Sequence, residues 1–414
     1  MAYLLNTTVT GNLVVSENIT TGNLYIGSTL LANSVGNTVD VYANSGSLQA
    51  ASRLNFNNTS SVSVTISAGI GGNANVQFTS ASISILTVTP STSQTDYNPA
   101  GLSSASELRV NPSATIAINS LQAQSDGFEI LLSNSSTDYL VILSPENTVA
   151  TAANRFKLPK GFPAFLMPGD SIKLVYNGTL SRWIVRSWAN QGQAMGLTFF
   201  TDFLEGTTGG TTSTVSGTGA ATQVSTYLVN VTEEPVGATQ LTTGTTTTGR
   251  ATLGNAGTAQ IVPTTCAALH VARLAVETTV TAAQTFQVFT GFIDSAGGTA
   301  TDGVVWNNRW TGAVAEWSLD RFAAGTATRT TSGLTLDNNY NWYIIFINPA
   351  WTRADYISSP DGQTFTVSGS PTTGFPSSTQ FTAWVAASMI KSVGTTARTA
   401  TIDFAGYRVD GVRG

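Results

Sequence analysis

Short alternations of apolar and polar residues, with a period of two, run through most of the chain. Between residues 62 and 66, Val and Ile alternate with Ser and Thr, which is typical of a half-buried β-strand. Similar runs predict strands over residues 114–118, 127–132, 139–144, 171–176, 182–185, 269–276, 286–293, 341–347, 364–367, 381–386 and 401–409. Residues 140–143 are continuously apolar, which indicates a strand buried on both faces. Helical patterns are few, so the sequence predicts an all-β protein.

The first part of the chain, residues 1–100, is repetitive and almost uncharged. Thr-Gly-Asn-Leu occurs at positions 10–13 and again at 21–24, which indicates a short repeated β-unit. So little charge and such short strands are not expected to build a globular core alone. This part therefore predicts an attachment segment at the N-terminus, followed by a repetitive β-shaft that buries its apolar faces against copies of itself.

Two further parts follow the predicted shaft. Residues 101–190 predict a small all-β domain, in which Asn177-Gly178 marks a hairpin turn. Residues 197–414 contain many strands separated by turn residues and predict a jelly roll or β-sandwich. Within this last part, the Thr run at 245–248 suits an exposed face of a sheet.

Composition excludes several classes of function. Charged residues make up 10% of the chain and the net charge is -5, so no basic cluster favours nucleic acid or an anionic membrane as partner. The single cysteine, Cys266, cannot form an intrachain disulfide, and the single histidine, His270, excludes a zinc site with several His or Cys ligands. No signal peptide or membrane-spanning run is recognised. Neither a cofactor nor a metal is expected.

Several short motifs indicate a family. The last part contains Phe200-Thr201-Asp202-Phe203-Leu204, Gly291-Phe292-Ile293-Asp294, Asp302-Gly303-Val304-Val305-Trp306, Asn341-Trp342-Tyr343 and a terminal Asp403-Phe404-Ala405-Gly406-Tyr407-Arg408-Val409. With these motifs it resembles the jelly-roll (concanavalin-A-like) domain of tailed-bacteriophage tail fibre and head fibre proteins. The middle part, through Asn154-Arg155-Phe156, Leu166-Met167-Pro168-Gly169 and Arg182-Trp183, is similar to small β-domains of phage structural proteins. The resemblance implies a homotrimeric virion appendage for host attachment.

Catalytic chemistry finds little support in the sequence. Most acidic residues of the last part flank Gly or Asn, as in Asp302-Gly303 and Asp361-Gly362, where the side chain stabilises a turn. The jelly-roll glucanase spacing E-x-D-x-x-E is absent, and His270, on one face of a predicted strand, is interpreted as structural. Asp337-Asn338-Asn339 offers oxygen ligands for calcium but reads equally as a turn. We therefore expect no enzymatic activity.

Aromatic residues provide the candidate binding site. Six of the eight tryptophans lie between Trp306 and Trp384. Flat aromatic rings beside Asn, Asp and Arg are suited to sugars, which present apolar C–H patches next to hydroxyls. The candidate receptor-binding residues are Trp306, Asn307, Asn308, Arg309, Trp310, Trp351, Arg353, Asp355 and Tyr356. Exposure is predicted for Trp310 and Trp351, with the alternative that these rings fill the core or a subunit interface.

Together these observations predict a non-enzymatic virion fibre protein. Its N-terminal region would bind another virion protein, and its trimeric jelly roll would bind a host-surface glycan or protein. Trimerisation is expected because surfaces poor in charge tend to be covered. The alternatives are a head fibre, capsid decoration or neck protein and, less favoured, a polysaccharide depolymerase.

Overall fold

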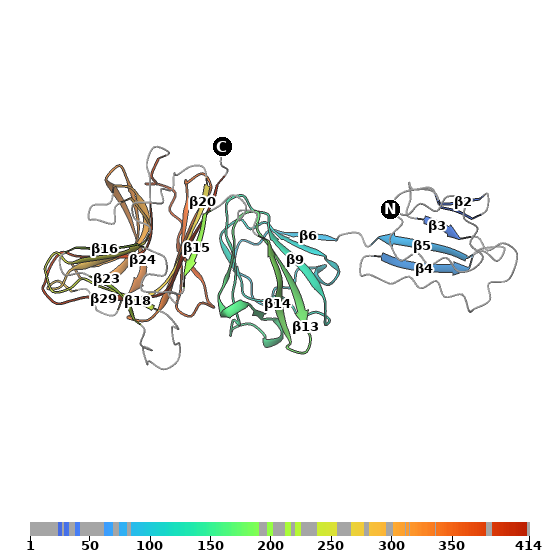
Figure 1. The fold of residues 1–414 in the computed structure, drawn as a ribbon, viewed down its shortest axis with the longest axis horizontal. Coiled ribbons are helices and arrows are strands. Elements are labelled where there is room, and N and C mark those ends of the chain that lie inside the picture. The colour runs from blue at the N-terminus through green and yellow to red at the C-terminus, as the bar shows by residue number, and fades with distance from the viewer. Residues whose placement is uncertain are drawn as a thin grey trace. The chain divides into compact units, whose positions relative to one another are not determined.

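The computed structural model describes isolated strands within residues 24–80, the continuous stretch 84–189, and then 197–201, 212–216, 220–224, 238–254, 266–276, 281–294, 301–310, 312–313, 315–335, 337–377 and 383–411. The chain divides into two compact units, residues 1–83 and 84–414. The described residues form strands and three single turns of 3-10 helix, η1 (Leu102–Ser104), η2 (Ala152–Asn154) and η3 (Pro159–Gly161) (Figure 1). This confirms the predicted all-β class. Among these residues no helix is long and apolar enough to cross a bilayer.

The first unit contains two small antiparallel sheets. β1 (Leu24–Ile26) pairs with β2 (Thr29–Ala32). β5 (Ala74–Ser80) lies between β3 (Thr38–Val41) and β4 (Val62–Ala68). The strand predicted over residues 62–66 is therefore confirmed. The first Thr-Gly-Asn-Leu repeat lies outside the described residues and the second reaches them only at Leu24, so the shaft remains a prediction.

The small β-domain consists of two sheets with a core between them. The six-stranded sheet has the order β11-β14-β13-β9-β7-β6, and the three-stranded sheet the order β12-β10-β8. Their bounds are β6 Ile85–Val88, β7 Glu107–Val110, β8 Ile116–Ile118, β9 Glu129–Asn134, β10 Val141–Leu143, β11 Phe156–Lys157, β12 Ala164–Leu166, β13 Ser171–Asn177 and β14 Arg182–Ala189. The domain begins before the predicted residue 101, because β6 pairs in parallel with β7. Asn177 pairs with Arg182, which confirms the hairpin.

One face of the six-stranded sheet is solvated. Glu129 on β9 lies 2.6 Å from Lys173 on β13 and 3.7 Å from Arg186 on β14. On the opposite face, Trp183 is buried in the domain core and its indole N–H donates to the Leu121 carbonyl at 3.0 Å. This mixed sheet therefore has one charged, solvated face and one apolar face that is packed on the core.

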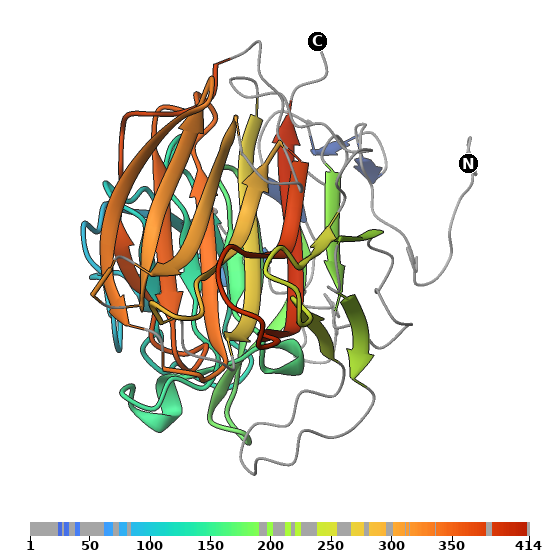
Figure 2. The same ribbon diagram turned by 90° about the vertical axis from the view of Figure 1, so that its left-hand side faces the viewer.

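The jelly roll comprises an eight-stranded and a seven-stranded sheet, with most of the strands side by side in Figure 2. The eight-stranded sheet has the order β17-β18-β29-β20-β25-β26-β27, and β15 also pairs with β29; the seven-stranded sheet has the order β16-β19-β28-β21-β22-β23-β24. The bounds are β15 Leu197–Thr201, β16 Thr212–Ser216, β17 Ala220–Val224, β18 Ala238–Thr242, β19 Arg250–Gly254, β20 Cys266–Val276, β21 Phe286–Ile293, β22 Gly303–Trp310, β23 Ala315–Ala323, β24 Thr326–Thr335, β25 Asn341–Ile347, β26 Ala354–Ser359, β27 Thr366–Gly369, β28 Ala383–Lys391 and β29 Thr399–Gly411. The Thr run at 245–248 was predicted to lie on an exposed face of a sheet. It instead forms the turn between β18 and β19.

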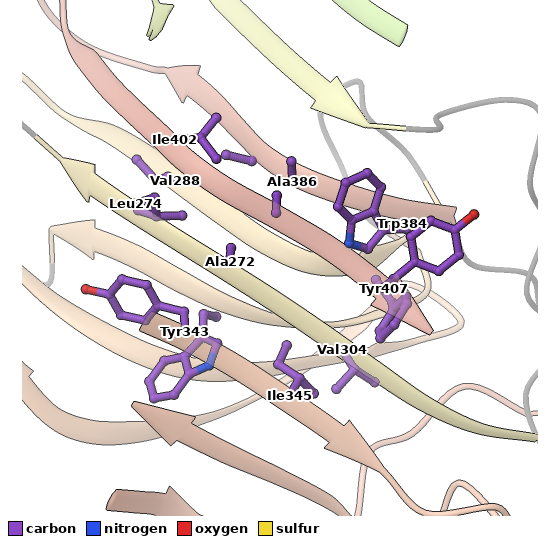
Figure 3. Packing of buried hydrophobic residues seen from close by; sticks show 14 of the residues in the cluster. Ala272, Leu274, Val288, Val304, Tyr343, Ile345, Trp384, Ala386, Ile402 and Tyr407 are labelled. Atoms are coloured by element: carbon purple, nitrogen blue, oxygen red, sulfur yellow. The ribbon is translucent and has the colours of Figure 1, made fainter. Parts of the chain in front are cut away.

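Large aromatic side chains fill the space between the two sheets (Figure 3). Trp306 of β22 is fully buried, and its indole N–H donates to the Ile344 carbonyl in the opposite sheet at 3.1 Å. Trp384 packs against Tyr407 with ring centroids 5.0 Å apart. Trp384 is therefore a core residue, and the satisfied indole of Trp306 lets a polar N–H be buried without loss.

A second apolar core joins the small domain to the jelly roll. Leu140 and Ile142 of the small domain pack with Leu269, Ile344 and Phe346, on the face of the eight-stranded sheet that points away from the sandwich core. The alternate residues Val141 and Leu143 belong to the small domain's own core. The prediction that 140–143 is buried on both faces is confirmed, because this segment lies between two cores. We call this interdomain contact the seam.

Candidate receptor-binding face

Three of the candidate receptor-binding residues lie in the sandwich core. Trp306 and Tyr356 are fully buried, and Trp351 is 2% exposed. The predicted exposure of Trp351 is therefore wrong. The backbone N–H of Trp351 donates to the Asn348 carbonyl at 2.9 Å, and Trp351 has a positive φ of 53°. This tight turn directs the indole inward. There the indole N–H donates to the Cys266 carbonyl at 2.8 Å.

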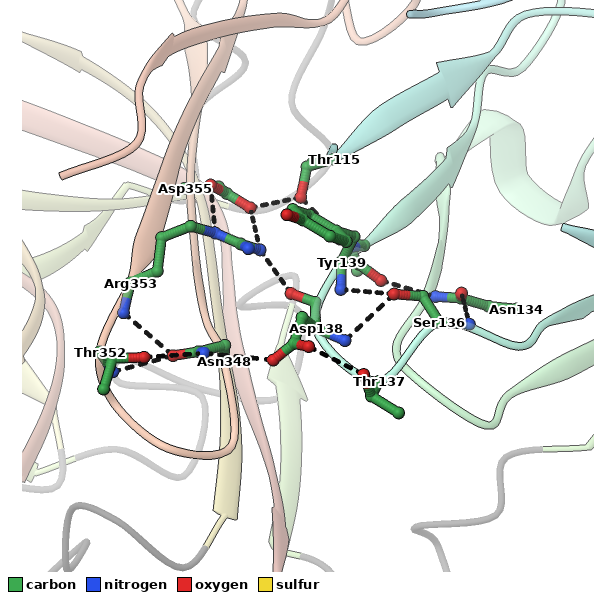
Figure 4. Close-up of polar contacts among 11 residues, drawn as sticks. Thr115, Asn134, Ser136, Thr137, Asp138, Tyr139, Asn348, Thr352, Arg353 and Asp355 are labelled. Carbon is green, nitrogen blue, oxygen red and sulfur yellow. Dashed lines mark hydrogen bonds and ion pairs between the residues drawn. The ribbon is translucent and has the colours of Figure 1, made fainter. Parts of the chain in front are cut away.

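Arg353 and Asp355 lie at the seam (Figure 4). The Arg353 guanidinium donates to Asp355 Oδ1 at 3.0 Å and to the Asp138 carbonyl of the small domain, and it lies 3.9 Å from the centre of the Tyr139 ring. Thr115 of the small domain donates to Asp355 Oδ2. Both side chains are thus occupied in holding the two domains together, which sequence spacing alone did not indicate.

Asn307 and Arg309 lie on the other face of the seven-stranded sheet, which points away from the sandwich core and which we call the outer face. Successive side chains of a strand point to opposite faces, and Trp306 and Asn308 point inward; the Asn308 amide donates to the Glu316 carbonyl at 3.4 Å. Trp310 is half-buried and packs against the core cluster. Of the five consecutive candidates, two therefore reach the outer face.

Asn307 forms a polar cluster with two residues of neighbouring strands. Its amide donates to Asp320 Oδ2 of β23 at 2.8 Å, and Arg329 Nε of β24 donates to the same oxygen at 3.1 Å. Asn307 and Asp320 are 0% exposed, whereas the Arg329 side chain is 43% exposed. Strand register explains the contact, because Asp320 pairs directly with Arg329 and lies diagonally from Asn307.

Two buried oxygen atoms of this cluster lack a hydrogen-bond partner within the described part of the chain. They are Asn307 Oδ1 and Asp320 Oδ1. The amide orientation is fixed, because Nδ2 donates to the carboxylate, so both free atoms are acceptors. An unsatisfied buried polar group costs about 1–3 kcal/mol. Such a pair of acceptors calls for a donor from outside the protein, such as a hydroxyl group or water.

An apolar floor adjoins these acceptors on the outer face. Phe289 of β21 pairs directly with Asn307. It packs edge-on against Phe322, with ring centroids 6.4 Å apart, and both belong to a cluster with Val305 and Val385. The outer face therefore places aromatic and aliphatic groups beside hydrogen-bonding groups, which is the combination predicted for a sugar site, with phenylalanine in place of tryptophan.

The charges around the cluster balance. Arg309 Nη2 lies 3.9 Å from Glu316 Oε1, and its Nε is buried without a hydrogen-bond partner among the described residues. Together with Arg329 and Asp320, two positive and two negative described side chains surround the cluster. This balance favours a neutral ligand over a strongly charged one.

Several carboxylates of the jelly roll have turn or strand contacts. Asp302 accepts from the Ala324 N–H at 2.9 Å, as a turn residue does. At Asp361, burial raises the pKa, but backbone hydrogen bonds from Thr364 and Gln363 outweigh it and lower the pKa overall. Asp320 and Glu316 lie four residues apart on one strand, or about 13 Å in extended backbone, beyond the roughly 5–9.5 Å of glycosidase pairs.

The single histidine is part of the sandwich core. Trp384 Nε1 donates to His270 Nδ1 at 2.8 Å, and His270 Nε2 lies 2.8 Å from Thr290 Oγ1, whose hydroxyl donates to the Ala386 carbonyl at 2.6 Å. The ring is therefore neutral, with its proton on Nε2. Burial lowers the pKa of His270 to about 3. The structural interpretation of His270 is confirmed, and no group of three or more His, Cys, Asp or Glu side chains gathers as a metal site in the described residues.

Asp320, Arg329 and the two phenylalanines were not among the candidate receptor-binding residues. Residues 304–310 do not alternate regularly between apolar and polar side chains, so the sequence did not separate the outward Asn307 and Arg309 from their inward neighbours. The strand partners of Asn307 follow from register, which depends on a turn at residues 324–325 and a bulge between Glu316 and Ser318. Register of this kind is not encoded by the residues of one strand.

No protein-family model and no curated protein matches the chain. Among solved structures, a protein of unknown function from Shewanella oneidensis MR-1 is 14% identical, with a TM-score of 0.40 over 53% of this chain and 89% of that one. Peanut lectin is 11% identical, with a TM-score of 0.33 over 53% and 99%. A carbohydrate esterase from the Shiga toxin-encoding bacteriophage phi24B is 14% identical, with a TM-score of 0.32 over 52% and 98%. The jelly-roll assignment rests on the strand order given above.

Proposed function

We propose that this chain is a non-enzymatic fibre protein of a phage virion, whose jelly roll binds a host-surface glycan at the outer face around Asn307 and Asp320. The observation that carries the proposal is the pair of buried, unpartnered acceptor oxygens on these two side chains, directly beside the Phe289 floor. Sugar hydroxyls would donate to the two oxygens while an apolar face of the ring packs on the phenylalanine.

The geometry suits a neutral, hydroxyl-rich ligand better than other ligand classes. A sugar presents neighbouring hydroxyl donors for the two acceptors, whereas an anionic ligand would meet the negative charge of Asp320. Arg329, partly exposed at the rim, adds a donor to the same cluster. Phage attachment and a homotrimeric state come from the sequence resemblance and from the low charge of the chain, and they belong to the proposal with the N-terminal region as virion anchor.

A polysaccharide array tests the binding site. Asp320→Asn keeps the size of the side chain and removes its charge and one acceptor, so we expect binding of bacterial surface polysaccharides to fall at least tenfold. Glu129→Gln, the same chemical change on the solvated sheet of the small domain, is the matched control. Undiminished binding by a folded Asp320→Asn protein would refute the site.

Two further measurements address the rest of the proposal. Sedimentation of the full chain at micromolar concentration is expected to give a trimer, and a stable monomer would contradict it. Labelling of intact particles is expected at the tail, whereas labelling of the capsid would favour a decoration protein. Release of reducing ends from host polysaccharide would show a depolymerase instead.

A further inference from the structure

Two cationic side chains lie between the sheets at one end of the jelly roll. Lys391 is the last residue of β28, and Arg398 directly precedes β29. The loop that connects them is locked to the loop after β18: the Lys391 N–H donates to the Gly249 carbonyl at 3.1 Å, and the Arg398 N–H donates to Thr243 Oγ1 at 3.0 Å. Their positions are therefore fixed by backbone contacts rather than by their charges.

Lys391 is nearly enclosed. It is 3% exposed, and its ammonium group donates to the carbonyls of Gly244 at 2.5 Å and Thr396 at 3.1 Å. An ammonium group has three protons, so one remains for another acceptor. Both carbonyl groups are neutral, so they solvate the ammonium charge of Lys391 without neutralising it.

Arg398 also has no anionic partner among the described residues. Its Nε is buried and has no hydrogen-bond partner among the described residues. The ion pairs of the described part of the chain include neither Lys391 nor Arg398. Lys391 Nζ contacts the Thr396 carbonyl, two residues before Arg398, so the two cations belong to the same loop. Burial, and then the charge of Arg398, lower the pKa of Lys391.

Two like charges in a partly desolvated position are unfavourable unless an anion joins them. Arginine and lysine together are the usual protein ligands of phosphate, sulfate and carboxylate groups.

We propose that Lys391 and Arg398 bind an oxyanion at this end of the jelly roll, on the opposite side of the seven-stranded sheet from the outer face. The third ammonium proton of Lys391 and the Arg398 guanidinium donate to its oxygens. The chemistry fits an inorganic phosphate or sulfate group, or the carboxylate of a uronic acid. This site is independent of the glycan site at Asn307 and Asp320.

Calorimetric titration of the full chain with inorganic phosphate, sodium sulfate and glucuronate, each at constant ionic strength, tests the proposal and separates the three sources. Saturable binding of at least one anion is expected, with affinity lowered at least tenfold in Arg398→Gln. Arg186→Gln, at an exposed position on the small domain, is the control and is expected to bind like the unmodified protein. Absence of saturable binding for all three anions would overturn the proposal, as would equal binding by Arg398→Gln.

Lys391 itself is a weaker test position, because its two carbonyl contacts hold the loop. Thermal unfolding with and without the bound anion supplies a second readout. The anion is expected to raise the Tm of the unmodified protein and not that of Arg398→Gln; equal rises would indicate a general salt effect and refute the site. Asp320 has no part in either measurement, so failure here leaves the glycan proposal to its own test.

Discussion

Arg408 at the end of the jelly roll and Asp170 of the small domain form a buried ion pair across the seam. Arg408 Nη2 donates to Asp170 Oδ1 at 2.8 Å, and the two side chains are 3% and 0% exposed. Burial opposes the charge of Arg408, but its hydrogen bonds to Asp170 and Asp410 more than offset this and raise its pKa. Two residues 238 positions apart in the sequence thus share one desolvated contact.

Asp170→Ala is expected to destabilise both domains together. It leaves Arg408 buried with Asp410 alone, and it also removes the acceptor of the Met167 N–H. Breaking a buried ion pair costs about 3–5 kcal/mol of unfolding free energy. Because Arg408 keeps its contact with Asp410, we expect a loss near the lower figure. Chemical denaturation measures it.

The same experiment reports on the seam. If the shared core makes residues 84–414 one cooperative unit, tryptophan fluorescence and far-UV circular dichroism of Asp170→Ala will follow a single shifted transition. Glu129→Gln, at an exposed ion pair, is expected to change stability by less than about 0.5 kcal/mol. Two separated transitions would show that the domains unfold independently.

Stability is expected to fall with pH below about 6.5 because of His270. The pKa of His270 in the folded protein, about 3, lies below the ordinary value of 6.5 for an exposed histidine, so the unfolded state binds the extra proton. The stabilisation is complete above pH 6.5 and decreases by up to about 1.4 kcal/mol per pH unit as the pH falls towards 3. Between pH 7 and pH 5 this amounts to about 2 kcal/mol.

Unfolding free energies at pH 7, 6 and 5 check this effect above the range in which most carboxylates titrate. His270→Gln is expected to be less stable than the unmodified protein at pH 7 and to lose most of the pH dependence. A slope that persists in His270→Gln would assign the effect to other groups.

Trp351→Ala is expected to act on stability rather than on receptor binding. Removing a buried tryptophan costs about 3–5 kcal/mol, and the Cys266 carbonyl would lose its donor. Thermal unfolding and the polysaccharide array measure the two properties separately. Trp188→Ala, at a tryptophan that is exposed on β14, is expected to leave stability nearly unchanged. Weaker polysaccharide binding at unchanged stability would restore the interpretation of Trp351 as a surface residue.

Local sequence patterns predicted most strands of the second unit but not which faces of those strands are open. Residues 140–143 were recognisable because four consecutive apolar residues suit only a position with two cores. The burial of Trp351 was not recognisable, because its exposure was predicted from the polar residues beside it, whereas a turn with a positive φ directs its ring inward.

The seam and the polar cluster depend on contacts between distant segments. Arg353 and Asp355 have the composition of a binding site, yet Asp138 and Thr115 of another domain occupy them. Asp320 sits in an unremarkable strand, and only the register of β22, β23 and β24 places it beside Asn307 and Arg329. Neither property is carried by the residues of a single segment.

The double burial of β20 and β25 has a mechanical consequence. A hinge needs a chain segment with few packed neighbours, whereas here the strands that support the sandwich core also support the small domain. A pull on a glycan held at Asn307 would be transmitted as shear through continuously packed sheets into the small domain. Under the proposed function, such a body would behave as a stiff lever, with compliance left to parts outside these packed sheets.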